Sequence, residues 1–177
     1  MQQHMTGWIE RRTGNLIGLV ACIGLMGYAL YAQYGLGLEP CPLCILQRVA
    51  VIGVGVLFLL AWLHNPGDRG ARIYGALIDL VAVAGIAVAA RQIWIINQPP
   101  GSVAECGASL DYMMAVLPLH EVLAKVLSGS GECAKVDWTF LGLYMPTWVL
   151  MSLVVVGTWG LAVNWLGRRG LGSEVRG

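Results

Sequence analysis

Charged residues are scarce in this sequence, and their scarcity excludes most soluble folds. Only 12% of the 177 residues are charged and 57% are hydrophobic, whereas an ordinary soluble domain has roughly 25% charged residues. The basic residues form no patch large enough for nucleic acid. Histidine is also rare: His4, His64 and His120 are scattered along the chain, and the sequence has a single C-x-x-C motif. The ligand spacing of a zinc site is therefore missing. We therefore expect a lipid bilayer to be the main solvent.

Four apolar segments are long enough to cross a bilayer, which takes about 20 residues. The sequence predicts an all-α membrane protein, a single domain over residues 1–177 built as a four-transmembrane-helix bundle. The expected spans are Leu16–Tyr34, Ile45–Leu63, Ile73–Ile96 and Thr147–Leu166. The first is long for the apolar part of a signal peptide and no clear cleavage site follows it, so we expect it to be retained.

The distribution of Lys and Arg predicts the orientation in the membrane. Arginines are concentrated in residues 1–15, 64–72 and 167–177, while residues 35–44 and 97–146 carry only Lys125 and Lys135 as basic residues. Because basic residues accumulate in cytoplasmic segments, both termini are expected in the cytoplasm. The loops 35–44 and 97–146 are then expected on the outer side.

Four of the five cysteines fall in these two outer loops, and Cys22 lies within the first span, where we expect an inert packed thiol. Exported compartments permit disulfides, so two structural disulfides are one interpretation. Cys41 and Cys44, however, form a C-x-x-C motif, which is commonly redox-active. No strand–helix–strand pattern surrounds it, which excludes a soluble thioredoxin fold. Cys106 and Cys133 are widely separated in the second loop.

The start of the second span combines features that favour a thiolate at Cys44. Unpaired N–H groups and the helix dipole at a helix N-terminus stabilise an anion, and Pro42 suits the first helical position. Arg48 lies one turn deeper on the same face, about 6 Å below Cys44 by helix rise. It is expected either to hydrogen-bond an apolar redox partner or to extend toward the lipid headgroups. Arg91, in the same leaflet, has the same two interpretations.

The second outer loop contains a short amphipathic helix. Its apolar residues recur at helical spacing, after Pro118 and before a Gly/Ser-rich stretch, and they are Leu119, Val122, Leu123, Val126 and Leu127. This helix is too short to span a bilayer. We expect it either to lie on the membrane surface or to pack against the helix bundle.

Several motifs together resemble the bacterial disulfide bond formation protein B (DsbB) family, and the resemblance extends over essentially the whole chain. The motifs are Cys41-Pro42-Leu43-Cys44 followed by Gln47-Arg48, Gly131-Glu132-Cys133, and Trp138-Thr139-Phe140-Leu141-Gly142-Leu143-Tyr144-Met145-Pro146-Thr147-Trp148. The resemblance implies an enzyme of the bacterial inner membrane with its reactive cysteines in the periplasm. Such an enzyme reoxidises a soluble DsbA-like thiol oxidase and transfers two electrons to ubiquinone or menaquinone.

The resemblance also implies roles for individual residues. Cys106 would be attacked by the partner's thiolate, and Cys133 would attack the Cys41–Cys44 disulfide at Cys41, releasing Cys44 to face the quinone. Arg48 would bind the quinone head group, and Arg91 matches less securely.

Two other functions remain open at this point. A thiol enzyme of the vitamin K epoxide reductase type also combines a C-x-x-C with quinone chemistry, although there the motif is expected after the loop cysteines. The other is a non-enzymatic scaffold whose loops are joined by structural disulfides. Such a scaffold has no need for Arg48 one turn from Cys44.

Overall fold

Four long helices dominate the computed structural model, which describes residues 10–99, 114–128, 133, 139–140 and 142–167. Each is long and apolar enough to cross a membrane. They are α1 (Arg11–Tyr34), α2 (Pro42–His64), α3 (Asp68–Ile96) and α7 (Met145–Leu166). The prediction of an all-α, multi-pass membrane bundle is confirmed.

The helices extend beyond the predicted spans mainly where charged residues flank the apolar runs. α1 begins at Arg11 instead of Leu16, and α3 begins at Asp68 instead of Ile73. Hydropathy locates the hydrocarbon-crossing part of a helix, whereas backbone hydrogen bonding continues through the polar boundary. At the other ends of these two helices, Tyr34 and Ile96 are the predicted last residues.

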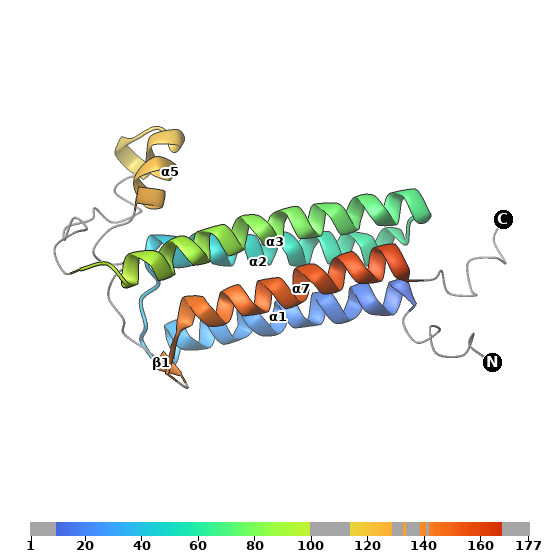
Figure 1. The fold of residues 1–177 in the computed structure, drawn as a ribbon, viewed down its shortest axis with the longest axis horizontal. Helices are drawn as coiled ribbons and strands as arrows, with labels where there is room; N and C mark the ends of the chain where they lie inside the picture. The colour runs from blue at the N-terminus through green and yellow to red at the C-terminus, as the bar shows by residue number, and fades with distance from the viewer. Residues whose placement is uncertain (1–9, 100–113, 129–132, 134–138, 141, 168–177) are drawn as a thin grey trace.

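The four helices pack side by side as a closed ring in the order α1, α2, α3, α7, with α7 returning to α1 (Figure 1). Phe58, Ile78 and Leu153 are fully buried at its centre. Gly160 permits the close approach of α3 and α7, since a Cβ there would lie 2.5 Å from Cγ2 of Ile78. The cross-section is therefore tightly packed between these two helices.

Polar side chains connect the helices at the end of the bundle where α1 begins and α7 ends. Asn15 and Asn164, both buried, exchange hydrogen bonds of 3.2 and 2.9 Å, and Arg11 forms an ion pair with Asp68 at 2.6 Å. Amides within a bilayer need such partners because lipid tails offer none. The amide pair joins α1 to α7, and the ion pair joins α1 to α3.

The opposite end of the bundle carries α5 (Leu119–Ser128) and a small hairpin (Figure 1). Val122 and Val126 of α5 are buried against Leu43 of α2 and Ile95 of α3, so the structure shows α5 packed against the bundle, the second of the two predicted arrangements. The hairpin pairs β1 (Thr139–Phe140) with β2 (Leu143–Tyr144) and leads directly into α7. It was not predicted, although Gly142, at a φ of 77°, marks its turn.

Candidate active site

The Cys41–Cys44 pair is formed by the N-terminal turn of α2. Cys41 is the N-cap residue, Pro42 begins the helix, and the backbone N–H of Cys44 donates to Sγ of Cys41 at 3.4 Å. An N-cap side chain commonly accepts from the residue three positions later, and this spacing is that of the C-x-x-C motif. The helix thus begins three residues before the predicted span, and Cys44 lies in its first turn. Sγ of Cys41 donates to Sγ of Cys44 at 2.9 Å.

A third cysteine, Cys133, lies beside this pair. It is buried with Leu43, Ile95 and the two valines of α5 in one apolar cluster, and Cys41 packs against that cluster. The pKa of the Cys41 thiol is raised, first by its hydrogen bond to the Cys133 side chain, then by that to Cys44, and then by burial. All three influences favour the neutral thiol. The structure therefore brings together three of the four cysteines predicted from the sequence.

Cys106, the fourth predicted cysteine, lies outside the described residues. Its role as the entry point for a partner's thiolate stays a prediction.

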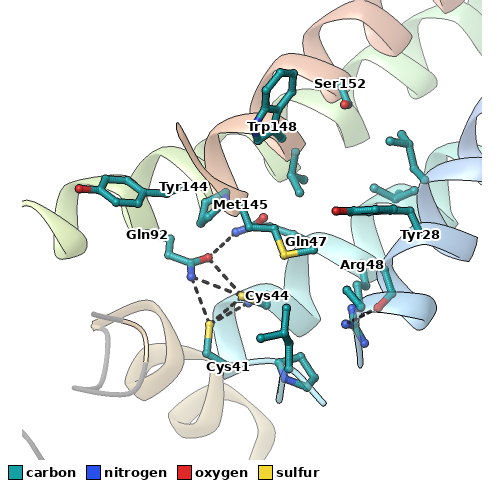
Figure 2. Close-up of a pocket in the computed structure, with 18 of the residues that line it drawn as sticks. Tyr28, Cys41, Cys44, Gln47, Arg48, Gln92, Tyr144, Met145, Trp148 and Ser152 are labelled. Atoms are coloured by element: carbon teal, nitrogen blue, oxygen red, sulfur yellow. Dashed lines mark hydrogen bonds between the residues drawn. The ribbon is translucent and has the colours of Figure 1, made fainter. Parts of the chain in front are cut away.

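Two buried amides lie next to the sulfur atoms, and neither was predicted as a site residue, although Gln47 belongs to the motif that resembles the family. Gln47 of α2 donates from Nε2 to Oε1 of Gln92 at 2.7 Å. Nε2 of Gln92, on α3, donates to Sγ of Cys41 and to Sγ of Cys44, both at 3.3 Å. Figure 2 shows Gln92 between the two cysteines and Gln47. The sequence signal for Gln92 was an amide beside Arg91 near the end of an apolar segment.

A cavity of about 500 Å³ adjoins the cysteine pair, within the range of small-molecule sites. Its walls come from α1, α2 and α7, with Gln92 and Ile96 from α3, and they are mainly apolar (Figure 2). The polar or sulfur-containing residues that line it are Met26, Tyr28, Glu39, Cys41, Cys44, Gln47, Arg48, Gln92, Tyr144, Met145, Trp148 and Ser152.

Arg48 lines this cavity and is held by the first helix. Its Nη1 donates to Oε1 of Gln33, and its Nη2 donates to the carbonyl of Ala29 at 3.2 Å. A guanidinium has five N–H donors, so donors beyond these two remain for a ligand in the cavity. The two hydrogen bonds to α1 account for the position of the Arg48 guanidinium without a contact to lipid headgroups.

Arg91 lies away from this cavity, and its predicted part in a quinone pocket stays a prediction. Its Nε donates to the carbonyl of Leu127 at 3.1 Å, and its guanidinium lies 4.3 Å from the ring centre of Trp94. Leu127 is in the last turn of α5, where carbonyls lack helical partners. Arg91 therefore contacts the C-terminus of α5 and does not line the cavity. Helical position alone could not show that α5 covers this side of α3.

Comparison with known proteins is consistent with this arrangement. Residues 11–163 match the sequence model of the family described as disulfide bond formation protein DsbB. A disulfide bond formation protein B from Chromobacterium violaceum is 51% identical over 162 residues, covering 91% of this chain and 96% of the relative. A protein of the same name from Methylococcus capsulatus is 46% identical over 158 residues, covering 89% and 96%.

Proposed function

This chain belongs to the DsbB family of disulfide bond formation proteins, and on that premise we propose that it oxidises a periplasmic DsbA-like thiol oxidase and delivers the electrons to a membrane quinone. Membership supports the coarser statement, a membrane oxidoreductase that forms disulfides. One observation supports the more specific proposal, that a DsbA-like partner is oxidised and a quinone accepts the electrons. The sulfurs of Cys41 and Cys44, with Cys133 beside them, lie at the wall of an apolar cavity that also contains a cationic donor, Arg48.

The proposed exchange begins in the second outer loop. A thiolate of the reduced partner attacks Cys106 of a Cys106–Cys133 disulfide, forming a mixed disulfide and releasing the Cys133 thiolate. The partner's second thiolate then displaces Cys106, so the partner leaves oxidised. Each step exchanges one disulfide for another and conserves electrons.

The second exchange moves the electron pair to the cavity. Cys133 attacks Cys41 of the Cys41–Cys44 disulfide and releases Cys44 as a thiolate, and the Cys106 thiolate then restores its bond to Cys133, leaving Cys41 and Cys44 reduced. The hydrogen bond between Cys133 and Cys41 supports attack at Cys41 rather than at Cys44. When bound, a quinone supplies the terminal acceptor for two electrons and two protons.

The residues around the cavity fit such an acceptor. A quinone is an apolar ring with two carbonyl acceptors, and the cavity is largely apolar with donors on Arg48 and Gln47. Arg48 would hold one carbonyl through a charge-assisted hydrogen bond, which is stronger than one from a neutral donor. Either ubiquinone or menaquinone satisfies this chemistry.

The direct test is reconstitution of the full chain with a reduced thioredoxin-fold oxidase and either quinone. We expect quinol to form in a one-to-one ratio with the oxidised partner, and Cys44→Ser to abolish quinol formation. Partner oxidation at an unchanged rate without quinone, or quinol formation by Cys44→Ser, would refute the proposed route.

The proposed orientation places both termini in the cytoplasm and the cysteine-bearing end of the bundle in the periplasm. It rests on the arginines of residues 1–15, 64–72 and 167–177. After mild reduction of spheroplasts, a membrane-impermeant maleimide added outside should label Cys106 and Cys133. Labelling only in inverted vesicles would reverse the orientation.

A further inference from the structure

Gln92 occupies a position that a membrane-spanning helix normally fills with an apolar residue. Its side chain is only 4% exposed, and a buried amide within a bilayer is costly unless its polar atoms are paired. The partners it has are sulfur atoms and another amide, from α2. Gln92 and the cysteine pair are 48 or more positions apart in the chain, so the contact depends on the packing of α3 against α2.

Gln47 determines which end of the Gln92 amide faces the sulfurs. Because Nε2 of Gln47 donates to Oε1 of Gln92 at 2.7 Å, Nε2 of Gln92 points to Cys41 and Cys44 (Figure 2). Gln47 is itself only 3% exposed, so water does not compete for this bond. The two amides thus form an oriented pair, with the donor at the cysteine end.

The Gln92 amide can form a hydrogen bond with Cys44 both when Cys44 is a thiol and when it is a thiolate. Oε1 of Gln92 accepts from the Cys44 thiol at 3.6 Å, while Nε2 of the same side chain is placed to donate to a thiolate. A hydrogen bond to an ionised group is stronger than one to a neutral group, and a disulfide sulfur is a weaker acceptor than a thiolate. The contact therefore stabilises the reduced pair more than the disulfide.

We propose that Gln92, oriented by Gln47, is a positioning residue that holds the Cys41 and Cys44 sulfurs together and makes their disulfide more oxidising. This inference rests on the proposed function, because it takes the pair to be redox-active. Stabilisation of the reduced form raises the reduction potential of a disulfide. A pair with a raised potential accepts electrons more readily from the loop cysteines.

The test is the redox equilibrium of the Cys41–Cys44 pair in the purified full chain, without quinone, in thiol–disulfide buffers. The substitutions Cys106→Ser and Cys133→Ser restrict the measurement to this pair. Gln92→Met keeps the length of the side chain and removes the donor. We expect about a tenfold fall in the equilibrium constant for reduction, about 30 mV in potential, which corresponds to one hydrogen bond to an ionised group.

Two further variants separate positioning from packing. Gln47→Leu should lower the same constant less than Gln92→Met does, and it should have no added effect in the double variant, since Gln47 acts through Gln92. Gln98→Met is the matched control, because Gln98 is a partly exposed amide just after the end of α3, and its side chain donates to the backbone carbonyl of Trp94 and not to a sulfur. It should leave the constant unchanged.

The outcomes of these measurements test the positioning role of Gln92 separately from the proposed function. If Gln92→Met stays within twofold of the parent, the positioning role is refuted while the proposed function stands. If the parent pair forms no disulfide in any buffer, the proposed function itself fails. Should Gln92→Met not fold, Gln47→Leu decides, and an unchanged constant in that variant refutes the proposal.

Discussion

Removal of the Arg48 guanidinium is the sharpest test of the cavity as a quinone site. Arg48 reaches the cavity from α2 and is steadied by Gln33 and the Ala29 carbonyl of α1. Arg48→Ala deletes the cationic donor of the cavity wall but leaves Cys41 and Cys44 in place. We expect the apparent KM for quinone to rise while thiol exchange with the protein partner continues.

The magnitude follows from the number of bonds lost. Two of the N–H groups are engaged by α1, so one further charge-assisted bond to a quinone carbonyl is a conservative count. Such a bond contributes about 1.5–3 kcal/mol, which corresponds to roughly a 10- to 150-fold increase in KM. Arg48→Lys should recover part of this loss, because an ammonium restores the charge but not the planar donor geometry.

Initial rates of quinol formation at a series of quinone concentrations give the KM, and capture of the partner as a mixed disulfide reports exchange separately. Arg72→Ala, which removes an exposed arginine near the start of α3, is the control for loss of charge. A quinone KM within twofold of the parent in Arg48→Ala would contradict the assignment. Equal loss of partner exchange would instead show that Arg48 acts on the thiols.

Three further predictions address other parts of the structure. Arg91→Ala should leave the quinone KM unchanged but speed amide exchange in α5, because it removes the contact to the Leu127 carbonyl; a raised KM would return Arg91 to the quinone site. Cys133→Ser leaves Cys106 as a thiol, so when this variant is mixed with the oxidised partner, Cys106 should attack the partner's disulfide and hold the partner as a mixed disulfide, identified by peptide mapping, whereas linkage to Cys41 would overturn the proposed order. Gly160→Ala should destabilise the bundle by about 1–3 kcal/mol through overpacking against Ile78, measured by denaturation in detergent, while Gly24→Ala, with nothing within 4 Å of the new Cβ, should not.

The fold could be predicted because it depends on the mean hydropathy of segments of about 20 residues, which single residues change little. Four apolar runs predict the number of spans, and the flanking arginines predict their orientation. The helix ends Tyr34 and Ile96 were also predicted. The predicted span begins at Ile45 because hydropathy does not register an N-cap, whereas the prediction that Pro42 takes the first helical position is confirmed. The local chemistry of Cys41 and Pro42, a capping side chain followed by a fixed φ, places the start of α2 at Pro42.

The site was predictable only where its residues are close in sequence. Cys41, Cys44 and Arg48 lie within two consecutive turns at the start of one helix, so helical geometry predicts that they are close. Gln92 contacts the two sulfurs from another helix. A single amide in an apolar run carries no information about its partner across the bundle. The contact of Arg91 with the Leu127 carbonyl of α5 could not be predicted for the same reason, since the two residues are far apart in the sequence.

The closure of the helix ring also governs when the protein becomes functional during its synthesis. Tyr28 and Ala29 on one wall of the cavity belong to the first helix to leave the ribosome, while Trp148 and Ser152 belong to the last. A nascent chain that ends between Phe140 and Met145 already contains all four loop cysteines, Cys41, Cys44, Cys106 and Cys133, yet it lacks the α7 wall. A stalled chain of that length should therefore show no quinone-dependent oxidation in vesicles. On the proposed function, we expect electron transfer to quinone to begin only after the final helix has been translated and inserted.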